Sequence, residues 1–264
     1  MRKNFHAHTP RCGHAVGKEE EYIKAAIEAQ YDEFGFSDHT PWPDVSSPGM
    51  RMEMNELPGY IEAVRSVKNQ YKDKIKIYCG LECEYYPENS SWLKDTVDEY
   101  NIEYIILGNH FDFDDSSELY FGKCQTEQEI KRYLKTTIAA MSTGLYDFFA
   151  HPDLFLKEYP SFDDAAKQVS REICYASRNL NIPLEYNLLG LHSKNLGYFK
   201  GLGYPYNGFW EIAAEEKCQV ILNVDAHDPA HMLNTALYDE ALSTLKDLGL
   251  AIVSFTSDGF VPLK

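Results

Sequence analysis

Histidine and carboxylate side chains recur in this 264-residue chain directly after short apolar runs, at points where buried strands would end. His6 and His8 close the first run, and their spacing of two residues puts both side chains on the same face of a strand. His14 lies in the loop just beyond. Imidazoles combined with a few carboxylates suit zinc, manganese or iron better than calcium or magnesium. Polar residues take the same place after several later runs: Asp38, His39, Glu82, Asn109, His110, His151, Asp225 and His227.

These candidates outnumber the ligands of a single metal ion. A tetrahedral zinc takes four ligands, so two or three ions are needed to use seven histidines and two carboxylates. A carboxylate such as Glu82 is suited to bridging two ions. Paired metals about 3.5–4 Å apart are the usual device for hydrolysing phosphoesters and amides. One histidine after a strand is usually an ordinary loop residue, but the repetition at one topological point favours a metal centre.

Short apolar runs alternate with amphipathic segments along the whole chain, which predicts strands that alternate with helices. The expected strands are Asn4–His8, Glu33–Ser37, Ile75–Leu81, Glu103–Leu107, Asp147–Ala150, Ile182–Tyr186, Gln219–Val224 and Leu250–Phe255. The expected helices are Glu19–Gln30, Leu57–Tyr71, Glu127–Met141, Asp164–Asn179 and a segment over 237–248. Thr126 and Glu129 form a capping box at the start of the third of these helices.

Seven or eight strands with helices between them favour a parallel sheet that is covered on both faces. At this length an α/β barrel is the natural closure, with all strand carboxyl ends at one rim, where such barrels carry their active sites. An open doubly wound sheet is the alternative, but neither a G-x-G-x-x-G motif nor a P-loop follows any expected strand. We therefore expect a single barrel domain over residues 1–264.

The composition narrows the function classes. With 25 Lys+Arg against 41 Asp+Glu, the net charge of −16 argues against binding to long nucleic acids or anionic lipid. No apolar run approaches the roughly 20 residues of a membrane-spanning helix, and the N-terminus lacks the hydrophobic stretch of a signal peptide. The six cysteines show no paired framework. A reduced, cytoplasmic protein that acts on a small molecule is the simplest account; the oligomeric state is left open.

Taken together, the motifs H-x-H, C-G-H, S-D-H, G-L-E, G-N-H, H-P-D and D-A-H resemble those of the polymerase-and-histidinol-phosphatase (PHP) family, over about residues 3–256. The segment 55–86 is similar to the histidinol-phosphatase branch of that family. The resemblance implies a distorted (β/α)7 TIM-like barrel with a trinuclear centre of zinc, manganese or iron at the carboxyl ends of the strands. It also implies phosphomonoester hydrolysis, in which the ions activate water for in-line attack and stabilise the charge of the transition state.

Carried over by motif, the resemblance also implies a ligand set. The first ion would be held by His6, His8, Glu82 and Asp225. Glu82 would bridge to a second ion held by His110 and His151, and His14, His39 and His227 would hold the third. Glu82, Asp225 and His227 are the residues expected to take part directly in the reaction. Glu84, which shares a strand face with Glu82, is expected to lie beyond the strand end.

Substrate contacts are expected from the rim around these ligands. Where the family carries arginines for phosphate, this chain offers lysine and histidine, and Asn223 stands where family members tend to carry serine. An acidic segment, 112–118, is expected to form a solvated lid. The residues expected to bind substrate are Arg11, Asn109, Lys157, Tyr186 and His192.

The leading hypothesis is hydrolysis of L-histidinol phosphate to L-histidinol and phosphate in histidine biosynthesis. Within the same chemistry, another small phosphomonoester or phosphotyrosine is possible. An amidohydrolase-type barrel is a second hypothesis, because that superfamily also opens with H-x-H, although it needs neither Glu82 nor the set His14, His39 and His227. A non-catalytic metal-binding module is a third, but every ligand position is filled here.

Overall fold

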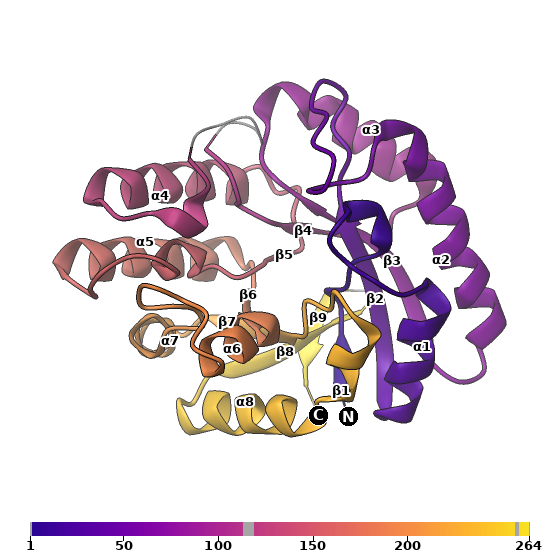
Figure 1. The fold of residues 1–264 in the computed structure, drawn as a ribbon. Helices are drawn as coiled ribbons and strands as arrows, with labels where there is room; N and C mark the ends of the chain where they lie inside the picture. The colour runs from indigo at the N-terminus through magenta and orange to yellow at the C-terminus, as the bar shows by residue number, and fades with distance from the viewer. Residues whose placement is uncertain (1, 113–118, 257–258, 264) are drawn as a thin grey trace.

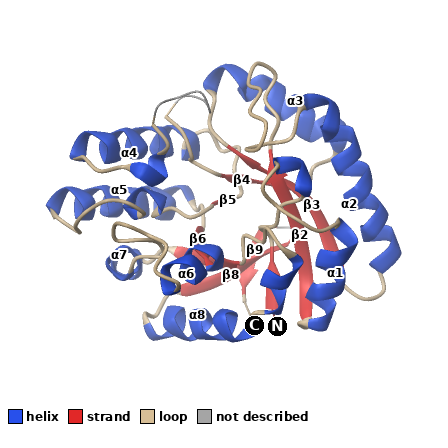
Figure 2. Ribbon diagram, viewed as in Figure 1, coloured by secondary structure: helices blue, strands red, loops and turns tan. Residues whose placement is uncertain are grey.

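The computed structural model describes residues 2–112, 119–256 and 259–263, so the predicted acidic lid lies, but for Asp112, outside the described residues. Strands and helices alternate, with the strands at the centre and the helices around them (Figure 1, Figure 2). The strands are β1 (Arg2–Asn4), β2 (Tyr31–His39), β3 (Lys76–Cys83), β4 (Tyr104–Leu107), β5 (Phe148–Phe149), β6 (Leu184–Asn187), β7 (Gln219–Asn223), β8 (Ala251–Thr256) and β9 (Gly259–Pro262). The helices are α1 (Glu19–Glu28), α2 (Leu57–Tyr71), α3 (Ser90–Tyr100), α4 (Glu127–Met141), α5 (Asp164–Leu180), α6 (Leu188–Asn195), α7 (Asn207–Glu215) and α8 (Thr235–Asp247).

The sheet runs in chain order. Strands β1 to β7 each pair in parallel with the next strand, and β9 turns back to pair antiparallel with β8. Between β1 and β7 a parallel bridge joins Ala7 to Ala226 and closes the ring. Seven strands therefore form the barrel wall, and the β8–β9 hairpin lies outside the ring. The barrel expected from the strand pattern is present, in the distorted (β/α)7 form that the family resemblance implies.

Two asparagine side chains complete the closure where the backbone ladder between β1 and β7 is interrupted. Asn223 Oδ1 accepts the backbone N–H of Phe5 at 2.8 Å. Asn4 Oδ1 accepts the backbone N–H of Val224 at 2.7 Å. Both asparagines are fully buried, and a buried N–H without a partner would be costly. These side-chain bonds thus replace strand pairing just below the segments that carry His6, His8 and Asp225.

The barrel interior is a packed cluster of aromatic and aliphatic side chains, closed by Phe255 of β8. Tyr104 crosses this interior and donates its hydroxyl to the carbonyls of Phe5 and Phe36 at 2.8 and 2.9 Å. Gly35 and Gly80 make room for it, since a Cβ at either position would lie 2.2 or 2.5 Å from the Tyr104 side chain. The polar strand ends therefore lie above a barrel interior that is filled with packed side chains. The cluster comprises Phe5, Tyr78, Tyr104, Ile106, Phe148, Ala150, Ile221 and Phe255.

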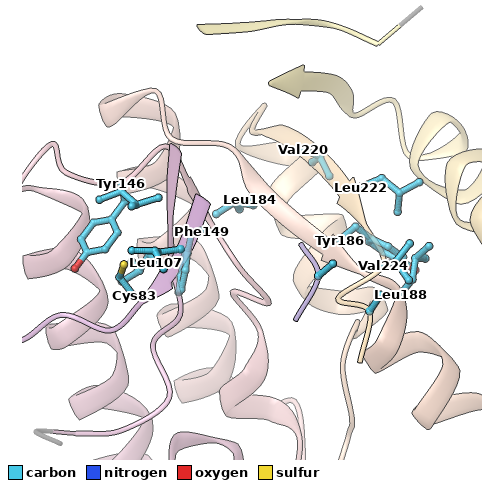
Figure 3. Close-up of a cluster of buried hydrophobic side chains, with 14 of the residues drawn as sticks. Cys83, Leu107, Tyr146, Phe149, Leu184, Tyr186, Leu188, Val220, Leu222 and Val224 are labelled. Atoms are coloured by element: carbon cyan, nitrogen blue, oxygen red, sulfur yellow. The ribbon is translucent and has the colours of Figure 1, made fainter. Parts of the chain in front are cut away.

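A second and larger apolar layer fills the space between the strands and the surrounding helices. Leu107, Phe149, Leu184, Tyr186 and Leu222 belong to this layer, and Figure 3 shows part of it, with side chains from β4, β5, β6 and β7. The predicted helix faces pack here: Ile130, Tyr133 and Met141 of α4 are buried, and the capping box of Thr126 and Glu129 is present.

The predicted elements are present, with differences at their ends. The first strand is shorter than expected: β1 ends at Asn4, so His6 and His8 lie in the segment that follows it. The second and third are longer, and Asp38, His39 and Glu82 lie inside them. Helices α3 and α6 and the strand β9 were not predicted. No helix among the described residues is long and apolar enough to span a membrane.

Candidate metal centre

A cavity of about 350 Å³ opens at the carboxyl ends of the barrel strands. Eight of the nine predicted metal ligands line it, and His6 lies fully buried beside them. Met50, Tyr120, Leu154, Leu189 and Tyr204 complete the wall. The structure therefore brings together side chains that span more than 200 positions of the sequence. The predicted ligands on the wall are His8, His14, His39, Glu82, His110, His151, Asp225 and His227.

Four ligand atoms converge at the deepest point of the cavity. His6 Nε2 lies 3.1 Å from His8 Nε2, and both nitrogens lie 3.5 Å from Glu82 Oε2. Asp225 Oδ1 lies 3.4 and 3.2 Å from the same two nitrogens. A tetrahedron of ligands about 2.1 Å from a central zinc has edges of about 3.4 Å. The spacing thus fits one four-coordinate divalent ion.

The hydrogen bonding around these atoms also fits a cation. Asp225 Oδ1 is buried and makes no hydrogen bond within the described part of the chain, and such acceptors are rare in folded proteins. Burial opposes ionisation of Glu82, but interactions with the neighbouring imidazoles, that of His110 foremost, outweigh it and hold the pKa of this carboxyl well below its usual range. His6 and His8 lower the pKa of Asp225 in the same way. The two carboxylates are therefore anionic ligands at neutral pH.

A second set of ligand atoms gathers around the other oxygen of Glu82. Its Oε1 lies 3.0 Å from His151 Nε2 and 3.4 Å from His110 Nε2. Gly108 makes room for this carboxylate, because a Cβ there would lie 2.4 Å from Oε1. Oε1 of Glu82 thus faces this second cluster, whereas Oε2 faces the first and also lies 3.1 Å from His39 Nδ1, so the carboxylate is placed to bridge ligand sets.

A third set lies at the mouth of the cavity, where nitrogen atoms of His14, His39 and His227 lie within 4.8 Å of one another. His14 is exposed, His39 is buried and His227 is half-buried. Burial and the neighbouring His8 lower the pKa of His227 to about 3, and burial holds the pKa of His39 below its usual range. Neutral imidazoles are the form that binds a metal.

Most of these imidazoles are oriented through their second ring nitrogen, as metal-ligating histidines usually are. His6 Nδ1 contacts Glu185 Oε1 at 2.8 Å, and His110 Nδ1 contacts Glu84 Oε1 at 2.8 Å. His8 Nδ1 lies 3.4 Å from Asp38 Oδ1. Backbone carbonyls of Cys12 and Asp225 lie 3.0 and 3.1 Å from Nδ1 of His14 and His227, respectively. Sequence reasoning missed the part of Glu185 entirely. It expected Glu84 beyond the strand end, and Glu84 directly follows β3, which ends at Cys83.

Two of the converging residues have a left-handed backbone. His151 has φ of 33° and Asp225 has φ of 55°. For residues other than glycine, such a backbone conformation costs about 1–3 kcal/mol. It persists where contacts with the surrounding structure hold it in place, which is often at functional sites. At both positions the chain turns sharply as it leaves its strand, and this turn aims the side chain into the cavity.

The predicted substrate-binding residues lie outside the wall of this cavity. Arg11 is engaged by Glu19, and Asn109 donates to Thr137 Oγ1 at 2.8 Å, which ties the end of β4 to α4. Tyr186 is buried in the outer layer against Trp210 (Figure 3). His192 lines a neighbouring apolar cavity of about 230 Å³, which shares Leu189 with the first.

Lys157 lies one layer behind the cavity. Its Nζ is 5.3 Å from the ring centroid of Tyr120 and 5.8 Å from that of Phe199. Tyr120 lines the cavity, and Phe199 stacks on Tyr204, which also lines it. Burial lowers the pKa of this ammonium group. Lys157 is thus a half-buried cation that is separated from the ligand cluster by aromatic rings.

Asp153, in the H-P-D motif, is a buried acid that sequence reasoning did not single out. Its Oδ2 accepts the backbone N–H of Tyr206 at 2.7 Å and Trp210 Nε1–H at 3.2 Å, whereas its Oδ1 is buried without a partner in the described chain. Burial raises its pKa to about 7. Asp153 therefore anchors the loop that carries Tyr204. Its carboxyl group stays protonated at acidic pH, where an ordinary aspartate is ionised.

Asp153→Asn is expected to stabilise the metal-free protein at pH 8, by roughly 5–10 °C in melting temperature. The unfolded chain releases this proton near pH 4, whereas the folded protein holds it until about pH 7. The contribution of Asp153 to the stability of the wild-type protein therefore decreases as pH rises from about 4 to about 7. Asparagine never ionises, so the variant does not lose stability over this pH range. The difference in melting temperature between variant and wild type should grow from pH 4 to pH 7. The exposed Asp44→Asn is the control, and a pH-independent difference would contradict the prediction.

Fold and site together define a histidine-rich (β/α)7 barrel with a metal-binding geometry at its carboxyl rim. The PHP domain model matches residues 4–188, and the chain belongs to the PHP domain family.

Individual relatives extend the similarity beyond the matched segment. The chain is 26% identical over 260 residues to a Deinococcus radiodurans protein named "Probable histidinol-phosphatase", covering 95% of each. It is 28% identical over 255 residues to the histidinol-phosphatase of Bacillus subtilis, covering 86% of this chain and 94% of that one. Among solved structures, the fold is similar to histidinol phosphate phosphatase from Lactococcus lactis, complexed with zinc, L-histidinol and phosphate. The TM-score is 0.76 at 20% identity, over 98% of both chains.

Proposed function

We propose that this protein is a metal-dependent phosphomonoesterase that hydrolyses L-histidinol phosphate to L-histidinol and phosphate. The observation that carries the proposal is the convergence of nine ligand side chains in three sets, with one oxygen of Glu82 facing each of the two inner sets. The relatives named as histidinol-phosphatases, matched over most of the chain, support the choice of substrate.

The proposed ligands divide into three groups. His6, His8, Glu82 and Asp225 hold the first ion, and Glu82, His110 and His151 hold the second. The third ion is held by His14, His39 and His227. Zinc, manganese and iron all suit this set of imidazoles and carboxylates. The presence of a third, all-histidine set supports this arrangement over an amidohydrolase-type site, which does not need it.

Bound ions would activate water and neutralise phosphate charge. The chain supplies the geometry for that chemistry. Asn187 Nδ2 donates to Asp225 Oδ2 at 3.0 Å, which leaves Oδ1 directed at the ligand cluster. From there Asp225 can orient the attacking water or take its proton. His227, at the mouth, stands where the substrate enters. Tyr120 and Tyr204 form part of the cavity wall.

The substrate contacts proposed from the sequence are Arg11, Asn109, Lys157, Tyr186 and His192, none of which lies on the cavity wall itself. Lys157 and His192 have the most direct support, because Lys157 packs on the wall residue Tyr120 and the cavity of His192 adjoins that of the metal ligands through Leu189. A lysine binds phosphate as a point charge, without the paired contacts of an arginine.

Lys157→Met should raise KM roughly 3- to 10-fold with little change in kcat, because Lys157 lies behind Tyr120 and acts on the phosphate as a nearby positive charge. A contact to phosphate that is equally strong in the ground and transition states affects binding alone. Steady-state kinetics of the metal-loaded enzyme measure the split. Lys157→Arg, which keeps the charge, should remain near wild type, and a loss confined to kcat in Lys157→Met would argue against a phosphate contact.

The first experiment is phosphate release by purified protein that has been loaded with manganese or zinc. The panel contains L-histidinol phosphate, p-nitrophenyl phosphate, phosphotyrosine and a nucleoside monophosphate. We expect kcat/KM for L-histidinol phosphate to exceed the others by several orders of magnitude. Similar, slow rates on all four would support the phosphatase chemistry but reject this substrate in favour of another small phosphomonoester.

We further propose that residues 1–264 act as one cytoplasmic domain. All six cysteines are buried free thiols, which suits a reducing compartment. The net charge of −16 favours a small-molecule substrate over a nucleic-acid polymer.

A further inference from the structure

Glu185 of β6 is a fully buried carboxylate beneath the candidate metal ligands. Its Oε1 accepts from His6 Nδ1 at 2.8 Å and from Asn223 Nδ2 at 3.0 Å. Its Oε2 accepts from the backbone N–H of His151 at 3.1 Å and from Asn187 Nδ2 at 2.9 Å. The four donors belong to four different segments of the barrel.

These four contacts use the full capacity of an ionised carboxylate. Each oxygen offers two lone-pair sites, and each site faces a donor. The amide orientations are settled independently, because Asn187 Oδ1 accepts Gly190 N–H and Asn223 Oδ1 accepts Phe5 N–H. His6 must therefore carry its proton on Nδ1, which leaves the lone pair of Nε2 directed at His8, Glu82 and Asp225.

The same network braces both residues that have a left-handed backbone. Glu185 holds the backbone N–H of His151 directly. Asn187 divides its two amide hydrogens between Glu185 Oε2 and Asp225 Oδ2, and so links Glu185 to the second strained residue. Asp38 and Glu84 contact ligand residues as well: Asp38 contacts the imidazole of His8 and accepts the backbone N–H of His39, and Glu84 contacts the imidazole of His110.

We propose that Glu185 is a positioning residue that couples the first and second metal sites. It sets the tautomer of His6 and, through Asn187, the orientation of Asp225 for the first ion, and it fixes the backbone of His151 for the second. The third set, which it does not touch, is independent of it. This inference rests on the proposed function in one respect, namely that the ligand sets bind metal ions.

The test compares zinc binding by wild type, Glu185→Gln and the control Glu103→Gln. Glu103 is a carboxylate near the start of β4 that pairs with Lys68 at the surface. A glutamine at 185 would turn an amide group toward two donors. We expect two of the three zinc ions to need a roughly 10- to 100-fold higher free zinc concentration in Glu185→Gln, with the third ion unchanged. Equilibrium dialysis against zinc buffers, with metal analysis, measures this.

A second readout needs no metal. In NMR spectra of the metal-free protein, the Nδ1–H proton of His6, assigned with a His6→Gln variant, should show a strong hydrogen bond to a carboxylate in wild type, and that signal should shift in Glu185→Gln because an amide oxygen is a weaker acceptor. Three zinc ions bound with wild-type affinity, or an unchanged His6 Nδ1–H signal, would overturn the inference. A wild-type protein that binds no zinc would instead overturn the proposed function.

Asn187→Ser provides the test if Glu185→Gln does not fold. The serine keeps a hydroxyl near the start of α6 but lacks the amide that bridges Glu185 and Asp225. Affinity for the first zinc ion alone should fall about tenfold, and wild-type affinity for all three ions would reject the coupling through Asn187.

Discussion

Glu82→Gln should lower kcat for phosphate release by roughly a thousandfold or more, since loss of even one charge-stabilising group in an active site commonly costs 10²–10³. Among the described residues, Glu82 directs one oxygen at each of the two inner ligand sets. Its Oε1 lies 3.0 Å from His151 Nε2, and its Oε2 lies 3.5 Å from His6 Nε2. The amide removes the negative charge from both sets. It also points an NH2 group at ligand atoms that need a cation between them.

The measurement pairs kcat with metal content, so that loss of ions and loss of chemistry are seen together. Glu103→Gln makes the same chemical change near the start of β4 and should behave as wild type. A Glu82→Gln enzyme with a wild-type kcat would reject the bridging role and, with it, the division of the ligands into three sets.

Removal of metal should lower the melting temperature by about 10 °C or more. One ion at a thousand times its dissociation constant stabilises the folded state by about 4.1 kcal/mol, and each kcal/mol corresponds to about 2–4 °C for a chain of this size. Without ions, Glu82 and Asp225 stay buried, and Asp225 Oδ1 has no hydrogen-bond partner in the described structure. The metal-free site is therefore a source of instability.

Scanning calorimetry before and after dialysis against a chelator tests this expectation, with metal content measured on the same samples. Added zinc should restore the original transition. Glu82→Gln, which lacks the bridging carboxylate, should respond much less to the chelator. A wild-type melting temperature that does not change when the ions are gone would show that the ligand cluster is stable by itself.

The ligand cluster was predictable because one rule acts at every strand: a parallel barrel collects all strand carboxyl ends on one rim. A polar residue directly after an apolar run is therefore a rim residue even when its partners are far away in sequence. His151 and Asp225 follow this rule, although their left-handed backbone carries no signal in the sequence.

Glu185 was not predictable by that rule, because it lies inside an apolar strand. In the expected strand, I-P-L-E-Y, Glu185 is the one charged residue of a buried run. Its partner His6 is 179 positions away. Asn109 illustrates the opposite case. It follows a strand as the ligands do, yet its amide is used to hold α4. Strand-end position locates the rim, but the direction of each side chain depends on packing against helices.

Helix α6 escaped prediction because it is short, with eight residues, and lacks a long apolar repeat. Its position depends on contacts made elsewhere, such as Asn187 at its start, whose Oδ1 accepts Gly190 N–H. The strand β9, which was also not predicted, pairs with β8. The place of β8 depends in turn on Phe255, which packs in the barrel interior.

The innermost ligand set joins His6 and His8, near the start of the chain, to Asp225, more than two hundred residues later. During synthesis, the chain exposes its first histidines long before their last partner leaves the ribosome, and contacts this distant in sequence form late in folding. The completed site can therefore capture its ion only after the seventh strand has docked beside the first. Tight uptake of metal would mark the end of folding rather than guide its beginning.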